Sequence, residues 1–271
     1  MSFELILCLL TLLSGLTWGF IKGVKFLKGK YKYLQLNNWH KIIREPIDFM
    51  ASLFPIFLIV FIFRSFMFEP FVIPSGSLEP TLEIGDFILV NKFDYGIRWP
   101  LSHQEIISTH APKRGDIMVF LYPEDRKMYF IKRVVGVPGD IISYIDKTLY
   151  INGKAMPQKV VGPAYEYDEH GNIWPVEQRE ENLDGVRHSI FVRPDIYDQN
   201  LYQIKVPPKS YFVLGDNRDD SRDSRYWGFV SNDDVVGKAA YIWFSWNSQT
   251  SEWADKIRFQ QVASNCLILK D

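Results

Sequence analysis

Three short segments of the sequence combine residue types that could carry out nucleophilic or acid–base chemistry. In the first, Pro74-Ser75-Gly76-Ser77, the proline and glycine predict a tight turn that presents Ser77 with little steric cover. A serine in such a turn acts as a nucleophile when a base lies within hydrogen-bond reach. Most tetrapeptides of this kind are ordinary turns, so this segment by itself is weak support for a site.

The second segment, residues 129–140, places a lysine inside an apolar strand. Strand alternation puts Lys132 on the same face as Phe130 and Val134, where its ammonium group would be desolvated. Burial lowers the pKa of a lysine, and a neutral lysine can take the proton of a serine hydroxyl. The alternative is an edge-strand lysine that prevents pairing with other chains, and this segment by itself favours that alternative.

The third segment, residues 215–228, is dense in aspartate, arginine and serine and ends near Trp227. Such a composition predicts a loop that is held by its own ion pairs. A calcium-binding loop is the competing hypothesis, but Arg218 occupies a position where an EF-hand has an oxygen ligand, and no glutamate follows at the closing position. We therefore expect this loop to support a nearby site.

Several other kinds of site are absent from the sequence or lack support in it. There is no HExxH, GxSxG, Walker or SxxK motif. The cysteines, Cys8 and Cys266, lie far apart without metal-ligand spacing, so we expect neither a disulfide nor zinc, and no cofactor. The net charge of -1 does not suggest nucleic acid as a partner. The histidines lie in polar surroundings and are expected at the surface: His40, His103, His110, His170 and His188.

Two apolar stretches near the N-terminus predict membrane-spanning helices. Leu5–Ile21 carries no charge, and Phe49–Phe63 can be extended by its apolar flanks to residues 47–68. The first lacks the preceding basic region of a cleaved signal peptide. The intervening residues 22–46 are strongly basic, which makes a buried hairpin of a soluble protein the weaker alternative. The basic residues are Lys22, Lys25, Lys28, Lys30, Lys32, Lys41 and Arg44.

The basic loop also predicts the orientation in the membrane. Short loops rich in lysine and arginine stay on the cytoplasmic side. We therefore expect spans at 1–21 and 47–68, a cytoplasmic loop at 22–46, and both the N-terminus and residues 69–271 outside the cytoplasm.

Residues 69–271 are predicted to form a mainly β domain, because short runs of β-branched and aromatic residues alternate with turn sequences. A polar segment at about 156–205 interrupts the pattern, and it is either a subdomain that contacts substrate or a solvated excursion. The aromatic residues Trp243, Phe244, Trp246 and Trp253 either rest on the membrane surface or pack in the core. The predicted strands are Phe87–Val90, Ile117–Leu121, Met128–Val135, Ile141–Ile145, Thr148–Ile151, Tyr211–Leu214 and Val235–Trp246.

Together the three segments resemble the sequence boxes of bacterial type I signal peptidases. The serine turn after a membrane span, the Lys-Arg-Val-Val-Gly-x-Pro-Gly-Asp strand and turn, and the Gly-Asp-Asn-Arg-Asp-x-Ser-x-Asp-Ser-Arg loop follow the order of the family. The resemblance implies a serine peptidase of the cytoplasmic (inner) membrane of bacteria that removes signal peptides. Its implied partners are secretory preproteins, the lipid bilayer and the export machinery.

The resemblance also implies roles for individual residues. Ser77 is the expected nucleophile and Lys132 the expected general base. Ser221 would orient the lysine amine, and Ser75 would help the Ser77 backbone amide to bind the oxyanion. Asp223 and Arg225 would brace the loop. The substrate pockets would be lined by Phe71, Ile73, Leu78, Leu82, Phe130 and Ile131.

One position departs from the family pattern. The residue after the nucleophile is usually methionine, and here it is Leu78, so we expect an altered pocket shape with retained activity. Two rival functions remain at this point. A membrane-tethered β module that binds partners would not need Ser77 or Lys132, and a Ser-His peptidase would use His103 or His110 as its base.

Overall fold

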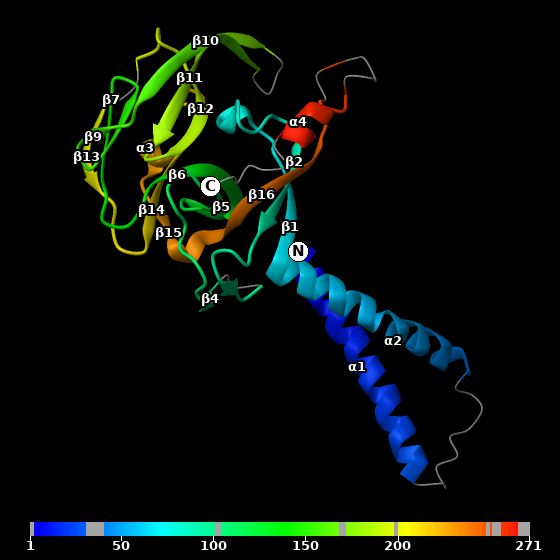
Figure 1. Cartoon of the computed structure of the whole chain (residues 1–271). Coiled ribbons are helices and arrows are strands. Elements are labelled where there is room, and N and C mark those ends of the chain that lie inside the picture. The colour runs from blue at the N-terminus through cyan, green and yellow to red at the C-terminus, as the bar shows by residue number, and fades with distance from the viewer. Residues whose placement is uncertain are drawn as a thin grey trace. The chain divides into compact units, whose positions relative to one another are not determined.

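The structure is a computed structural model in which residues 3–30, 41–100, 104–167, 172–197, 200–247, 250 and 256–264 are described. Contacts divide the chain into two units. The first contains the helical residues up to Met67 together with Trp99 and Pro100, and the second contains the remaining described residues from Phe68 onward. Each unit is described by itself (Figure 1).

The N-terminal unit consists of helix α1 (Phe3–Lys30), helix α2 (Lys41–Ile62) and one π-helical turn, η2 (Phe63–Met67). The helices pack closely, since the Phe54 ring occupies the space that a Cβ on Gly15 would need. Helix α2 continues through its two internal prolines, Pro46 and Pro55. Helix α1 extends to Lys30, beyond the predicted end of the first span at residue 21. The centre of the predicted cytoplasmic loop, residues 31–40, lies outside the described residues.

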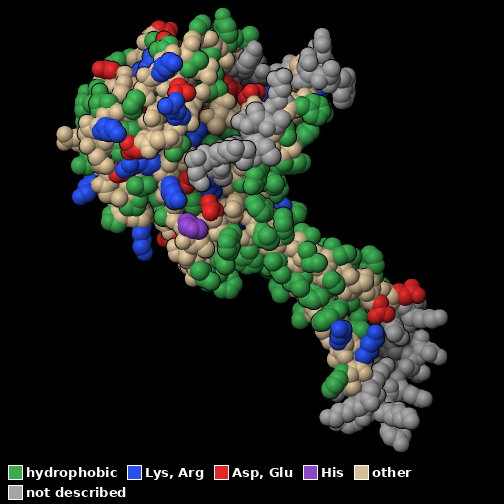
Figure 2. All heavy atoms as spheres, in the orientation of Figure 1, with side chains coloured by type: hydrophobic (Ala, Val, Ile, Leu, Met, Phe, Trp, Pro, Cys, Tyr) green, Lys and Arg blue, Asp and Glu red, His purple; other side chains and the backbone are tan. Residues whose placement is uncertain are grey.

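The surface of this helical pair is apolar. Segments Phe3–Phe26 and Glu45–Met67 are both long and apolar enough to cross a bilayer. Figure 2 shows hydrophobic side chains over much of the visible side of both helices. The most exposed of these side chains include Leu12, Leu16, Phe20 and Ile59. Such a surface is unfavourable in water and indicates burial in lipid.

The second unit is built on a seven-stranded sheet in the order β1-β2-β16-β5-β6-β14-β15. Strand β16, the last of the described strands in sequence, pairs with both β2 and β5. The strands are β1 (Phe68–Val72), β2 (Asp86–Asn91), β5 (Ile117–Tyr122), β6 (Asp125–Gly136), β14 (Ser210–Leu214), β15 (Val230–Ser231) and β16 (Val235–Ser245).

Smaller sheets and short helical turns complete this unit. One sheet is formed by β13 (Leu201–Lys205), β7 (Ile141–Ile145), β8 (Thr148–Ile151) and β9 (Lys154–Ala155), and another by β3 (Ile97–Arg98) and β4 (Glu105–Ile107). The helical elements are η3 (Gly76–Leu78), α3 (Ser224–Trp227), η4 (Asn232–Asp234) and α4 (Phe259–Ser264). The predicted mainly β fold is therefore confirmed, since no described helix beyond Phe68 exceeds the six residues of α4.

The polar segment at about 156–205 contains regular secondary structure. Most of it forms a three-stranded antiparallel sheet of β10 (Gln158–Tyr167), β11 (Ile173–Leu183) and β12 (Val186–Val192) (Figure 1). Its inward side chains include Leu183, Ile190 and Val192, which are buried. The acidic run Glu177–Asp184 of this segment contains Glu181, which is fully buried beside an arginine.

Strand β5 shows why the main sheet is a stable platform. Ile117, Val119 and Leu121 point into one buried cluster, and the alternate residues Met118 and Phe120 point into another. Both faces of the sheet are therefore covered. By contrast, Trp243 on β16 is half-exposed, so it is not a core side chain, and Trp253 lies outside the described residues.

Replacing Gly85 by alanine is expected to destabilise the β domain strongly. Gly85 has a positive φ of 89°, and a Cβ there would lie 2.0 Å from the carbonyl oxygen of Trp246. Gly139 has a similar φ of 93° but open space around it. We expect a loss of about 3 kcal/mol or more for Gly85→Ala and about 1 kcal/mol for Gly139→Ala, measured by thermal unfolding. Equal losses would mean that the clash is relieved by movement of Trp246.

Candidate active site

The structure brings the predicted nucleophile and base into direct contact. Ser77 lies in the helical turn η3 between β1 and β2, and Lys132 lies on β6 opposite Met118 of β5. The Lys132 Nζ donates a hydrogen bond to Ser77 Oγ at 2.6 Å, although 55 residues separate them in the sequence. Ser77 is less exposed than its turn predicts, since only 8% of its surface is accessible.

Lys132 is buried in the interior of the sheet. Strand β6 lies between β5 and β14, so the alternative of an edge-strand lysine is wrong. In the pairing of β5 with β6, Lys132 lies opposite Met118 and Phe130 lies opposite Phe120, so Lys132 and Phe130 share one face of the sheet. The Lys132 Nζ lies 5.6 Å from the centroid of the Phe130 ring. Burial lowers the pKa of Lys132 to about 8, against the opposing effect of the nearby carboxylates Asp223 and Asp216.

The loop at 215–228 packs directly against the nucleophile turn. A Cβ on Gly215 would lie 2.5 Å from the Ser77 carbonyl oxygen and 2.2 Å from Ser221 Oγ, so only glycine fits there. Asp223 accepts a hydrogen bond from the Gly215 backbone N–H at 3.0 Å and pairs with Arg225 at 2.9 Å. The predicted bracing pair therefore forms, and it ties the start of the loop to the short helix α3.

Ser221 is placed near this contact but does not bond the lysine. Its hydroxyl is buried beside Gly215, and the single hydrogen bond that Lys132 Nζ makes with the described residues is the one to Ser77. The orienting role of Ser221 stays a prediction. Ser75 is partly buried at the start of η3, and its side chain does not cap that turn.

The residues expected to line substrate pockets separate into two groups. Leu78 and Leu82 are fully buried, and Ile73 is nearly so, within the cluster beneath the nucleophile turn. These side chains support the nucleophile turn, and their role in substrate pockets stays a prediction. Phe71 and Ile131 pack on the same cluster from partly exposed positions, and Phe130 stacks on Tyr122 with ring centroids 4.3 Å apart.

A buried ion pair that no sequence pattern predicted lies next to the site. Arg133 follows the lysine and donates from Nε and Nη2 to the two carboxylate oxygens of Asp216 at 2.8 and 2.7 Å. Thr81 donates to the same carboxylate at 2.5 Å. The pair therefore links β6, the loop at 215–228 and the residues after Ser77. In the sequence, the two partners of this ion pair are marked by the dipeptides Lys132-Arg133 and Gly215-Asp216.

A second buried cluster corrects the prediction that all histidines are at the surface. His188 on β12 is buried, with Nε2 3.4 Å from Glu181 and 3.8 Å from Asp216. Burial and the charge of Arg133 lower its pKa. Glu181 also pairs with Arg218, whose guanidinium is fully buried. The side chain of His110 is 68% exposed, and His40, His103 and His170 lie outside the described residues.

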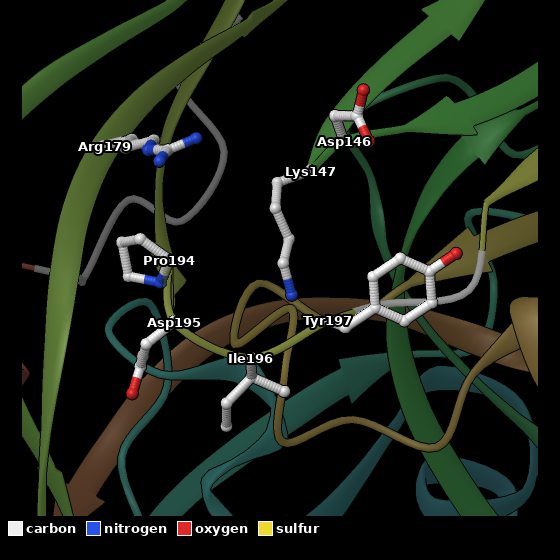
Figure 3. A pocket seen from close by; sticks show the side chains of 7 residues that line it. All are labelled: Asp146, Lys147, Arg179, Pro194, Asp195, Ile196 and Tyr197. Carbon is white, nitrogen blue, oxygen red and sulfur yellow. The ribbon is translucent and has the colours of Figure 1, made fainter.

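A separate cavity of about 430 Å³ contains none of the predicted site residues (Figure 3). Lys147 extends into it and pairs with Asp219. The other residues that line it are Asp146, Arg179, Pro194, Asp195, Ile196 and Tyr197. The described residues contain no cluster of three or more side chains that could hold a metal ion.

Comparison with known proteins places this geometry in a family. The model of the family described as signal peptidase, peptidase S26, matches residues 46–246. The chain belongs to the signal peptidase family. Signal peptidase I of Pseudomonas fluorescens is 45% identical over 76% of both chains, and that of Pseudomonas aeruginosa is 44% identical over 76% of both. Signal peptidase I of Buchnera aphidicola from Acyrthosiphon pisum is 39% identical over 94% of this chain and 96% of its own.

The region matched by the signal peptidase family contains all the residues that form the site. It begins within α2 and ends at Trp246, just after β16. The serine turn, the lysine strand and the loop at 215–228 lie within it, and so does the sheet β10–β12. Membership of the family makes this chain a membrane-associated peptidase and confirms the hydrolase class expected from the sequence.

Removing the Asp223 side chain should unfold the loop at 215–228. Arg225 has only 4% of its side chain exposed, so Asp223→Ala would leave a buried charge without its partner. We expect a loss of about 3 to 5 kcal/mol in the free energy of unfolding, and loss of activity with it. Glu124→Ala is the control, because Glu124 and its partner Arg222 are both exposed, and it should change stability by less than about 1 kcal/mol.

Thermal unfolding of both variants in detergent measures this difference. A similar shift for Asp223→Ala and Glu124→Ala would mean that water reaches Arg225 and that the pair is not a brace.

Proposed function

We propose that this chain is a membrane-anchored serine endopeptidase that removes signal peptides from exported preproteins, with Ser77 as nucleophile and Lys132 as general base. The observation that carries the proposal is the buried contact of 2.6 Å between Lys132 Nζ and Ser77 Oγ. A catalytic base must lie within about 3 Å of the proton that it takes, and Lys132 does. The names of the relatives supply the substrate class.

The chemistry follows from the lowered pKa of Lys132. The neutral amine accepts the proton of the Ser77 hydroxyl while Oγ bonds to the scissile carbonyl carbon. The resulting ammonium then gives its proton to the leaving nitrogen as the C–N bond breaks, which leaves an acyl-enzyme. Lys132 next takes a proton from the water that attacks the ester carbonyl carbon. It gives this proton to Ser77 Oγ as the bond between Oγ and the acyl carbon breaks, which frees the serine hydroxyl and the neutral amine. The Ser77 backbone N–H, with help from the Ser75 hydroxyl, is the expected oxyanion donor.

The proposed topology rests on the apolar helices and on the basic residues that follow the first of them. Lys22 and Lys25 lie in α1, near the end of its apolar segment Phe3–Phe26. Positive charges at that end favour the cytoplasm, so the N-terminus and the β domain lie on the other side of the bacterial inner membrane. A preprotein whose signal peptide lies in the membrane would then reach the site from the lipid side. Contact with the export machinery stays a prediction.

Cleavage of a purified preprotein in detergent tests the proposed roles. We expect the wild-type chain to cut after a small residue, and Ser77→Ala and Lys132→Ala to lose at least about a thousandfold in kcat/KM while remaining folded. The new N-terminus of the product identifies the bond that is cut. His110→Ala is the control and should cleave normally. Efficient cleavage by Lys132→Ala would identify a different base, and loss of cleavage in His110→Ala would favour a Ser-His mechanism.

The pH dependence gives an independent test of the base. The pKa of Lys132 is lowered to about 8, and the active form is the neutral one. Below this pKa the lysine is protonated, so kcat/KM should fall about tenfold for each pH unit, whereas above it kcat/KM should level off. Initial rates between pH 6 and pH 10 measure the profile. A midpoint near the ordinary histidine value of about 6.5 would contradict the assignment of Lys132.

A further inference from the structure

The sheet β10–β12 reaches the nucleophile turn through one buried carboxylate. Glu166 on β10 is only 1% exposed, and its carboxylate accepts hydrogen bonds from the Asn217 side-chain amide and from the guanidinium of Arg193. Asn217 is also 1% exposed and belongs to the loop at 215–228. A carboxylate buried this deeply is costly unless it is paired, and here both of its oxygens have partners.

Asn217 in turn holds the nucleophile turn at two consecutive carbonyl groups. Its backbone N–H donates to the Ser77 carbonyl oxygen at 3.2 Å, and its Nδ2 donates to the Gly76 carbonyl oxygen at 3.3 Å. Strand β12 holds the backbone on both sides of Asn217. The Phe191 N–H donates to the Asp216 carbonyl oxygen, and the Phe191 carbonyl oxygen accepts from the Arg218 N–H, each at 2.9 Å. The loop is therefore anchored to the β10–β12 sheet at the point where it meets the turn.

The peptide bond between Gly76 and Ser77 makes this contact relevant to catalysis. The Gly76 C=O and the Ser77 N–H belong to one planar unit and point in opposite directions. Whatever holds the Gly76 oxygen therefore also sets the direction of the Ser77 N–H, which is the expected oxyanion donor. A second bond to the same oxygen, from the Glu79 N–H at 3.0 Å, comes from within the turn itself.

Glu166 determines which way the Asn217 amide faces. An asparagine amide has a donating side and an accepting side, whereas a carboxylate only accepts. The Glu166 carboxylate therefore keeps Nδ2 in place, and the second hydrogen of Nδ2 is then directed to the Gly76 oxygen. Without Glu166 the amide could rotate and present its own oxygen to the Gly76 carbonyl, which would repel it.

We propose that Glu166 and Asn217 are positioning residues, through which the β10–β12 sheet aligns the Ser77 N–H with the developing oxyanion. The inference rests on the proposed function, because the direction of this N–H matters only if it stabilises the transition state. It assigns the segment at about 156–205 a role in the rate of the reaction, in addition to any contact with substrate.

The test compares Glu166→Ala with Glu180→Ala in the full chain, using cleavage of a preprotein-derived peptide to measure kcat and KM separately. Glu180 lies on β11 of the same sheet, and its surface pair with Arg187 leaves its side chain 44% exposed. We expect kcat of Glu166→Ala to fall about 10- to 100-fold with KM nearly unchanged, because oxyanion contacts strengthen only in the transition state. Glu180→Ala should match the wild type.

Two further readouts separate positioning from a merely structural role. The pH midpoint of Glu166→Ala should stay at the wild-type value, because the Lys132–Ser77 contact is untouched. Glu166→Gln should recover most of the lost kcat, because its side-chain oxygen can still accept from Asn217. A shifted midpoint, or a rise in KM equal to the fall in kcat, would overturn the proposal.

Equal kcat values for Glu166→Ala and Glu180→Ala would also overturn the positioning proposal. As long as the wild-type chain is active in the same assay, the proposed function would still stand. An inactive wild type would instead contradict the proposed function itself. Should Glu166→Ala fail to fold, Asn217→Ala replaces it. This variant loses Nδ2 but keeps the backbone bond to Ser77, and unchanged kcat in it would overturn the positioning role.

Discussion

The Lys132 amine must be able to lose its proton in a part of the protein that is rich in carboxylates. Burial lowers its pKa, but Asp216 and Asp223 act in the opposite direction. Both aspartates are themselves matched by arginines, Arg133 and Arg225, and accept hydrogen bonds from them. Arg225 acts in the same direction as burial and lowers the pKa of Lys132. The Lys132 amine can therefore be neutral although the loop at 215–228 is rich in carboxylates. The arrangement of the charged groups around it follows from this requirement.

The same charged groups give a short irregular loop a fixed conformation. Residues 215–228 contain only the four-residue helix α3, so regular backbone hydrogen bonding cannot hold them. Buried pairs at Asp216, Arg218 and Asp223 take its place. Such pairs add little net stability compared with apolar packing, but breaking one of them is costly, which favours a single geometry over several. The partners come from β6, β11 and the loop itself.

The sequence predicted the parts of this site that local patterns encode. Alternation of apolar residues located β2, β5 and β6 and placed Lys132 beside Phe130, and the glycine-rich turn located Ser77. It did not predict the sheet β10–β12, because Glu166, Glu181 and His188 are polar residues whose partners lie elsewhere in the chain. Nor did it predict that Leu78 is a core residue, since a single residue after a turn has no periodicity to show which side it faces.

The position of β16 has a consequence for the newly made chain. Among the described strands it alone connects β2, which follows the serine turn, with β5 and β6, which carry the lysine. A growing chain that still lacks residues 235–245 can form the β1–β2 and β5–β6 hairpins, but the strand that joins them is absent. Within the main sheet, the serine turn and the lysine strand are therefore joined by a pairing that is distant in sequence, and such pairings form late in folding.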